Sequence, residues 1–114
     1  MSNIKRAFIE TTVFTKRWQD LDLTDNDLQE LQNFLLKNPE AGDIIQGTNG
    51  ARKVRFALPD NDKGKRGGVR VIYVDIIKRE HIHLLLCYAK AKQDDLTTEQ
   101  KKQIKSLVHE LKGE

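Results

Sequence analysis

The chain has 114 residues, of which 38% are hydrophobic and 32% charged, and its formal net charge is +3. This length predicts a single domain over residues 1–114, and the composition is too apolar for a disordered chain. No stretch approaches the roughly 18 apolar residues that a membrane span requires, and the N-terminal sequence lacks the apolar region of a signal peptide. The single cysteine excludes an internal disulfide and a cysteine-rich zinc site. We therefore expect a cytoplasmic protein that does not bind a membrane.

The first part of the chain predicts one strand and two helices. Residues 5–12 mix apolar and β-branched types, which is typical of a short strand. Residues 13–21 carry apolar side chains at helical spacing, which predicts a short helix with Trp18 as its main anchor. Thr24, three residues before Asp27, predicts the N-cap of a second helix, which ends before Pro39 because proline disfavours a helical predecessor. The apolar stripe of this helix consists of Leu28, Leu31, Phe34 and Leu35.

The next segment is first acidic and then rich in turn residues. Residues 19–46 contain seven Asp or Glu and one Lys, so we expect any nucleic acid to bind on another side of the protein. Residues 41–50, AGDIIQGTNG, are too short and too rich in glycine to form an element of their own. Asn49 and Gly50 are a turn pair that leads into the next strand.

The last part of the chain predicts a hairpin and a helix. The runs 69–77 and 81–89 suit buried strands, and the three residues between them favour an antiparallel hairpin. Residues 96–111 form an amphipathic pattern, and Thr97 with Gln100 has the spacing of a capping box. The order is strand-helix-helix-strand-strand-strand-helix. With antiparallel neighbours and helices gathered on one face, it predicts an α+β fold, a small antiparallel sheet flanked by helices.

Positive charge is concentrated in residues 51–70, ARKVRFALPDNDKGKRGGVR. Seven Lys or Arg and two Asp give this stretch a charge of +5, so the rest of the chain is net acidic. Such a concentration is typical of a surface that binds phosphates, although a solvated charged face is an equally good explanation of the pattern alone. A strand would place Lys53 and Arg55 on one face and Val54 and Phe56 on the other. The cations are Arg52, Lys53, Arg55, Lys63, Lys65, Arg66 and Arg70.

Other catalytic patterns are weak. Cys87 lies in the middle of an apolar run, which favours core packing over a nucleophile. His81 and His83 share one face of a strand and form half of a metal site at most, so a place at the solvent edge is favoured. Asp94 and Asp95 directly precede a helix, whose dipole favours acids there, and we give less weight to general-acid chemistry by this pair.

The glycine-rich loop does not match a nucleotide-binding loop. The Walker pattern requires Ser or Thr after Gly-Lys because that hydroxyl binds magnesium, and here Arg66 follows Lys65. The remaining candidate surface is cationic, with one aromatic neighbour. It consists of Lys53, Arg55, Arg70, Tyr88, Lys90 and Lys92.

Three runs resemble one group of proteins in order and spacing. They are GDIIQGTNGARKVRFA (42–57), KGKRGGVRVIYV (63–74) and HLLLCYAKAKQDDLTTEQKKQIKSLV (83–108). Together they are similar to the RelE/HigB group of bacterial toxins from type II toxin–antitoxin pairs, especially its HigB branch. The resemblance covers nearly the whole chain, and the fold that it implies agrees with the element order above.

The resemblance implies a ribosome-dependent endoribonuclease that cuts messenger RNA in the decoding site. Its partners would be the 70S ribosome with its mRNA and a cognate antitoxin, with operator DNA bound only indirectly through the antitoxin. The family uses no metal and no cofactor, since Lys and Arg position the scissile phosphate for attack by the neighbouring 2′-hydroxyl. This agrees with the physical need of the reaction for positioning and positive charge.

Motif by motif, the resemblance assigns catalytic roles to Lys53, Arg55, Arg70 and Lys90. Contacts with RNA or the ribosome fall on Arg52, Lys63, Lys65, Arg66, Tyr88 and Lys92. Two positions depart from the RelE pattern, since Thr97 stands near where a tyrosine is expected and Ala91 where an arginine is. Tyr88 and Lys90 are the candidates to replace the missing groups.

Two other functions fit the same residues. One is a toxin of this fold that does not cleave RNA and inhibits DNA gyrase, as the related ParE toxins do. The other is a regulatory module that binds nucleic acid without toxicity. Retention of Lys53 and Arg55 together with Arg70 favours the nuclease.

Overall fold

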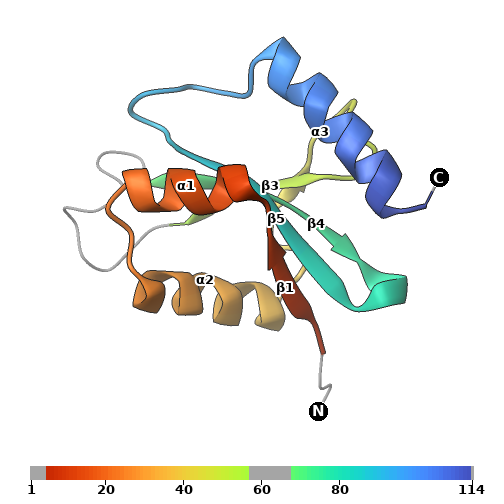
Figure 1. The fold of residues 1–114 in the computed structure, drawn as a ribbon, viewed down its shortest axis with the longest axis horizontal. Coiled ribbons are helices and arrows are strands. Elements are labelled where there is room, and N and C mark those ends of the chain that lie inside the picture. The colour runs from red at the N-terminus through yellow and green to blue at the C-terminus, as the bar shows by residue number, and fades with distance from the viewer. Residues whose placement is uncertain (1–4, 57–67, 114) are drawn as a thin grey trace.

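The computed structural model describes residues 5–56 and 68–113 (Figure 1). The loop cations Lys63, Lys65 and Arg66 therefore lie outside the described residues. The elements are β1 (Ala7–Glu10), α1 (Thr12–Asp20), α2 (Asp25–Lys37), β2 (Asp43–Ile44), β3 (Arg52–Phe56), β4 (Val69–Ile76), the 3₁₀ turn η1 (Ile77–Arg79), β5 (His81–Ala89) and α3 (Thr98–Leu111). None of the helices in this part of the chain is long and apolar enough to cross a membrane.

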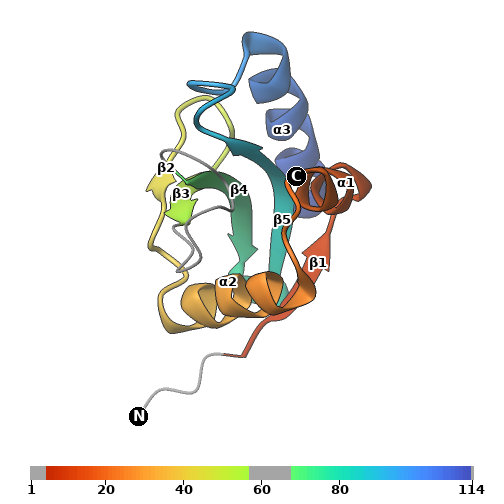
Figure 2. The ribbon, with the colours of Figure 1, turned by 90° about the vertical axis from the view of Figure 1, so that its left-hand side faces the viewer.

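Five strands form one sheet in the order β1-β5-β4-β3-β2, which Figure 2 shows from right to left. The predicted hairpin of β4 and β5 is confirmed as antiparallel, and so is the α+β class. The sheet is not wholly antiparallel, however, because β1 pairs with β5 in parallel. The side chain of Thr11 donates to the carbonyl of Leu85 at 2.8 Å, and its backbone N–H donates to that of Leu84 at 3.0 Å. These bonds tie the start of α1 to β5.

The helices cover both faces of the sheet. Phe14 and Trp18 of α1 and Leu31 and Leu35 of α2 join a core cluster on one face. The residues Ile104 and Val108 of α3 join a separate cluster on the other face. The prediction that the helices gather on one face is therefore wrong. Strands that are apolar on both sides need a cover on each side, and α3 supplies the second one.

The predicted helix ends are confirmed. The Thr24 side chain accepts a hydrogen bond from the N–H of Asp27 at 3.1 Å, and the Asp27 carboxylate accepts one from the N–H of Thr24 at 2.8 Å. Thr97 and Gln100 form the same reciprocal box at the start of α3. Trp18 is buried and donates its indole N–H to the carbonyl of Thr24 at 3.1 Å, so it anchors α1 as predicted.

The segment before β3 contains an element that the sequence does not indicate. Residues 43–44 form β2, where a turn region without an element is predicted. A Cβ on Gly42 would lie 2.8 Å from the carbonyl oxygen of Lys53, so only glycine allows this approach. The buried Tyr73 hydroxyl accepts from the N–H of Gly42 at 3.0 Å and donates to the carbonyl of Pro39 at 2.7 Å. β2 thus depends on its pairing with β3 and on the contacts of Tyr73, and not on local propensity.

A β-bulge changes which face the second half of β5 presents. Leu84 pairs with Tyr73 and Leu86 pairs with Ile72, so Leu85 is the extra residue. As a result, Leu84 belongs to the cluster under α1 and α2, whereas Leu86 belongs to the cluster under α3. Tyr88, two residues further, lies on the α3 face as well.

The fully buried Leu31 tests the packing of α2. We expect Leu31→Asp to lower the free energy of unfolding by about 3 to 5 kcal/mol or more, because it leaves a cavity and buries an unpaired carboxylate. A domain of this kind has only about 5 to 15 kcal/mol to lose. Thermal unfolding followed by circular dichroism measures the change. The matched control is Asn33→Asp on the exposed side of the same helix, which should change the stability by about 0.5 kcal/mol or less. A similar melting temperature for the two variants would contradict the packing.

Candidate functional site

A cross-strand row of polar side chains lies on the α3 face of the sheet. Arg55 of β3 stands opposite Arg70 of β4, which in turn stands opposite Tyr88 of β5. Arg55 is exposed and Arg70 is half-buried. Like charges directly opposite each other in a sheet repel one another. The register places these two arginines side by side on neighbouring strands, and guanidinium groups are well suited to bind phosphate.

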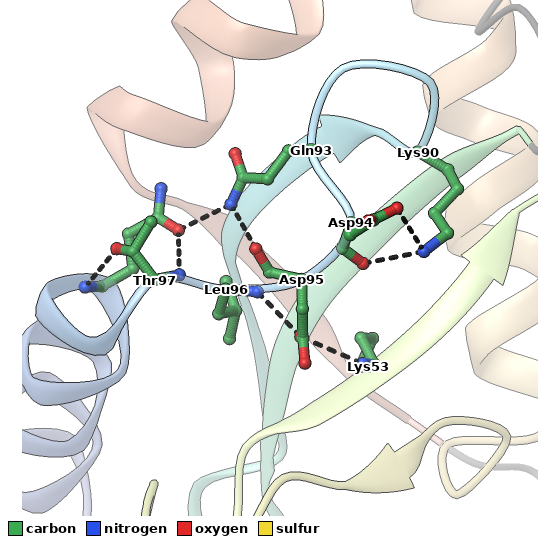
Figure 3. A network of polar contacts seen from close by, with 8 residues as sticks. Lys53, Lys90, Gln93, Asp94, Asp95, Leu96 and Thr97 are labelled. Carbon is green, nitrogen blue, oxygen red and sulfur yellow. Dashed lines mark hydrogen bonds and ion pairs between the residues drawn. The ribbon is translucent and has the colours of Figure 1, made fainter.

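Two lysines extend the row and are held by the loop between β5 and α3 (Figure 3). The Lys53 ammonium lies 3.2 Å from the Asp95 carboxylate. The Lys90 ammonium lies 3.1 Å from the Asp94 carboxylate and also donates to the Asp94 carbonyl at 2.9 Å. The structure therefore places both predicted catalytic lysines at one loop segment.

The same loop is organised by hydrogen bonds of its own (Figure 3). The Asp95 carboxylate accepts from the N–H of Leu96 at 2.7 Å, and the Gln93 amide donates to the Asp95 carbonyl at 2.9 Å and to the Gln100 side chain at 2.7 Å. The bond from Leu96, followed by the bond from Lys53, lowers the pKa of the Asp95 carboxyl. Asp95 is consequently ionised at neutral pH, and Lys53 faces a full negative charge.

Tyr88 is buried, with 3% of its surface exposed. Its hydroxyl has no hydrogen-bond partner among residues 5–56 and 68–113, which is unusual for a buried polar group. Burial, followed by the charge of Asp95, raises the pKa of this phenol. Tyr88 therefore keeps its proton at neutral pH, and its hydroxyl lies beneath the surface of the site.

Two predicted contact residues lie away from the row. Arg52 alternates with Lys53 and lies on the opposite face, where it donates to the carbonyl of Gly42 at 2.7 Å. Lys92 is exposed and lines a hollow of about 280 Å³ that it shares with Arg17 of α1. Their roles in RNA binding stay predictions.

Cys87 is a core residue, as predicted. Its side chain is fully buried in the cluster under α1 and α2. Burial raises the pKa of the thiol to about 12, so little thiolate is present at neutral pH. This environment does not suit a nucleophile.

His81 and His83 lie at the other end of β5 from Tyr88. Their rings meet edge to face with centroids 5.8 Å apart, which confirms that they share one face. His83 is buried, contrary to the predicted place at the solvent edge, and burial lowers its pKa. The described part of the chain contains no cluster of three or more His, Cys, Asp or Glu that could hold a metal ion.

The acidic helix α2 and the cationic row lie on different faces of the sheet. The segment includes α2, which packs on the face opposite α3. Lys53 and Arg55 point to the α3 face because their neighbours Val54 and Phe56 fill the core under α1 and α2. The position of α2 agrees with the prediction that the acidic segment lies away from the cationic surface, whereas Asp43 of β2 stands opposite Lys53 and does not.

No protein-family model matches the chain. Among solved structures, it is similar to an arginine double mutant of the toxin RelE from E. coli in the free state. The TM-score is 0.58 and the sequence identity 16%, over 88% of this chain and 98% of that one. The chain has a RelE-like fold. At this identity the similarity establishes the fold alone.

Proposed function

We propose that the chain is a toxin of the HigB branch of the RelE/HigB group, a ribosome-dependent endonuclease that cuts messenger RNA and stops translation. The observation that carries the proposal is the row Arg55, Arg70 and Tyr88, with Lys53 next to it on β3, within a RelE-like fold. The row supplies positive charge and a protonated phenol in one place.

The proposed chemistry uses the nucleophile that RNA itself carries. The 2′-oxygen attacks the adjacent phosphorus, the bond to the 5′-oxygen breaks, and the products are a 2′,3′-cyclic phosphate and a 5′-hydroxyl. Arg55 and Arg70 would bind the nonbridging oxygens, whose charge grows in the transition state. Lys53 and Lys90 would hold the phosphate in line and assist proton transfer, and no metal or cofactor enters the reaction.

The remaining candidate residues would bind RNA outside the reacting phosphate. The loop cations Lys63, Lys65 and Arg66 would contact ribosomal RNA, and Arg52, Tyr88 and Lys92 would contact the messenger or the ribosome. In this proposal the single-domain toxin acts in the cytoplasm and is neutralised by a cognate antitoxin. It binds operator DNA only indirectly, through that antitoxin. Mapping of messenger 5′ ends after expression with and without the antitoxin separates this function from gyrase inhibition and from a non-toxic module.

Salt dependence tests the loop cations. With Lys63, Lys65 and Arg66 changed to Ala, the slope of log affinity for ribosomes against log salt should fall by up to about 0.7 to 0.9 for each lost phosphate contact. The control replaces three cations elsewhere, Lys16, Lys37 and Arg79, with Ala. It removes the same charge and should leave the slope unchanged. Equal slopes for the two triple variants would exclude the loop from the interface.

Chelation tests the metal-independent mechanism. Cleavage should persist when EDTA is added at a level that leaves enough magnesium to keep the ribosome intact, because positive side chains supply the electrostatic stabilisation. Single-turnover cleavage on programmed ribosomes is the measurement. A loss of activity that added zinc or manganese restores would instead point to a metal and make His81 and His83 candidates again.

Arg70 provides the sharpest test of the active site. Removing one donor that stabilises charge in a transition state slows a reaction by about 100- to 1000-fold, so Arg70→Ala should cut at least about 100-fold more slowly in single turnover. Arg70→Lys should not restore the rate, because lysine offers a point charge and not two parallel donors. Ribosome binding and antitoxin binding should both persist.

The matched control is Arg79→Ala at the other end of the β4–β5 hairpin, which removes the same group and should retain cleavage. Near-parental cleavage by Arg70→Ala would overturn the assignment of this residue. A defect that is explained entirely by weaker ribosome binding would do the same.

A further inference from the structure

We infer that Asp94 and Asp95 act as specificity-determining residues, because in the free protein their carboxylates occupy the positions at which Lys90 and Lys53 bind RNA phosphates. A loosely bound polyanion is then disfavoured, and an RNA strand placed across the site displaces both carboxylates. The inference deepens the proposed function and rests on it for the identity of the ligand.

The contacts assign one carboxylate to each lysine. Asp95 lies 3.2 Å from the Lys53 ammonium, although the two residues are 42 positions apart in the sequence. Asp94 lies 3.1 Å from the Lys90 ammonium. A carboxylate at this distance from an ammonium resembles a phosphate oxygen in charge and in hydrogen bonding. Each lysine therefore already has an anionic partner before any RNA binds.

Both ion pairs are accessible to solvent and can be exchanged. The exposed fractions of the side chains are 33% and 55% for Lys53 and Asp95, and 36% and 95% for Lys90 and Asp94. Ion pairs of this exposure are weak, so a phosphate can replace the carboxylate without disrupting the fold. The carboxylate remains a competitor, and on the same scale each pair lowers the affinity for RNA by at most about fivefold.

The position of the two aspartates on one loop explains how they discriminate between a single phosphate and an RNA strand. Asp94 and Asp95 are adjacent, and they hold one lysine of β3, Lys53, and one lysine directly after β5, Lys90. A single phosphate that reaches one lysine still meets the second carboxylate close by. A strand that also binds Arg55 and Arg70 brings several phosphates at once, and its combined contacts outweigh both competitors.

A purely structural role for Asp95 makes a different prediction. Its carboxylate also accepts the N–H of Leu96, ahead of α3, and a local cap of this kind would explain the residue without any ligand. Asparagine keeps an oxygen that accepts this bond and loses the negative charge. Likewise, the bond from Lys90 to the Asp94 carbonyl does not depend on the side chain of residue 94. Substitution with Asn thus separates competition from folding, and a thermal melt checks that the fold is retained.

The test measures equilibrium binding of a single-stranded 12-nucleotide oligouridylate by fluorescence anisotropy at fixed low salt. The double variant Asp94→Asn/Asp95→Asn should bind about 2- to 25-fold more tightly than a control with the same net charge. The control is Glu99→Gln/Glu110→Gln, which removes two exposed carboxylates of α3. Asp95→Asn should contribute more than Asp94→Asn, since Asp95 is the less exposed of the two.

A double-mutant cycle assigns the effect to the pair. In a Lys53→Ala background, Asp95→Asn should change the affinity no more than Glu99→Gln does, because the lysine that the carboxylate blocks is absent. A double variant that binds like its charge-matched control, or more weakly than the parent, would overturn the inference, as would a gain that survives in Lys53→Ala. Binding does not require cleavage. The binding experiment can therefore support or overturn the inference even if the Arg70 experiment overturns the proposed nuclease. A failed inference likewise leaves the proposed nuclease intact.

Discussion

The candidate site depends on the register of β3. Val54 and Phe56 are each only 7% exposed and fill the core under α1 and α2, so the residues between them must point to the other face. A slip of one residue would bring Lys53 and Arg55 into an apolar core and expose two large apolar side chains. Because burial of charge is far less favourable than burial of Val and Phe, the core fixes the direction of the cations. Gly42 and Tyr73 support the same register, since they hold the preceding segment against β3.

The bulge in β5 is the second requirement for the site. Along an unbroken strand, Tyr88 would share a face with Leu84 and would join the core under α1 and α2. The extra Leu85 shifts the alternation, so that Tyr88 lies in the same row as Arg55 and Arg70. Its hydroxyl is buried there and has no hydrogen-bond partner among the described residues.

Local sequence patterns predict much of the fold and of the candidate site, and the features that they do not predict have physical explanations. The helix starts at Thr24 and Thr97 depend on hydrogen bonds between residues close in sequence, so a single sequence predicts them. The alternation of residues 53–56 correctly predicts that Lys53 and Arg55 share one face of the sheet. The run 81–89 is apolar at almost every position, however, so its periodicity carries no information about a bulge or about which helix covers which side. The parallel pairing of β1, the contact of Gly42 with Tyr73 beside β2 and the contact of Lys53 with Asp95 all join residues far apart in sequence. Such contacts are decided by packing, and no spacing rule applied to a single sequence reveals them.

The electrostatics of the site explain why the acids of the loop matter in the free protein. Two arginines stand opposite each other and two lysines lie near them, and the repulsion between these like charges opposes folding. Asp94 and Asp95 offset part of this repulsion while the site is empty, and they do so through contacts weak enough to yield to a phosphate. A buried ion pair would have stabilised the lysines more rigidly but would have resisted exchange, because removing one partner leaves an uncompensated charge. In the proposed function, solvent exposure of the acids therefore lets the site be partly neutralised in the free protein and still accept a phosphate.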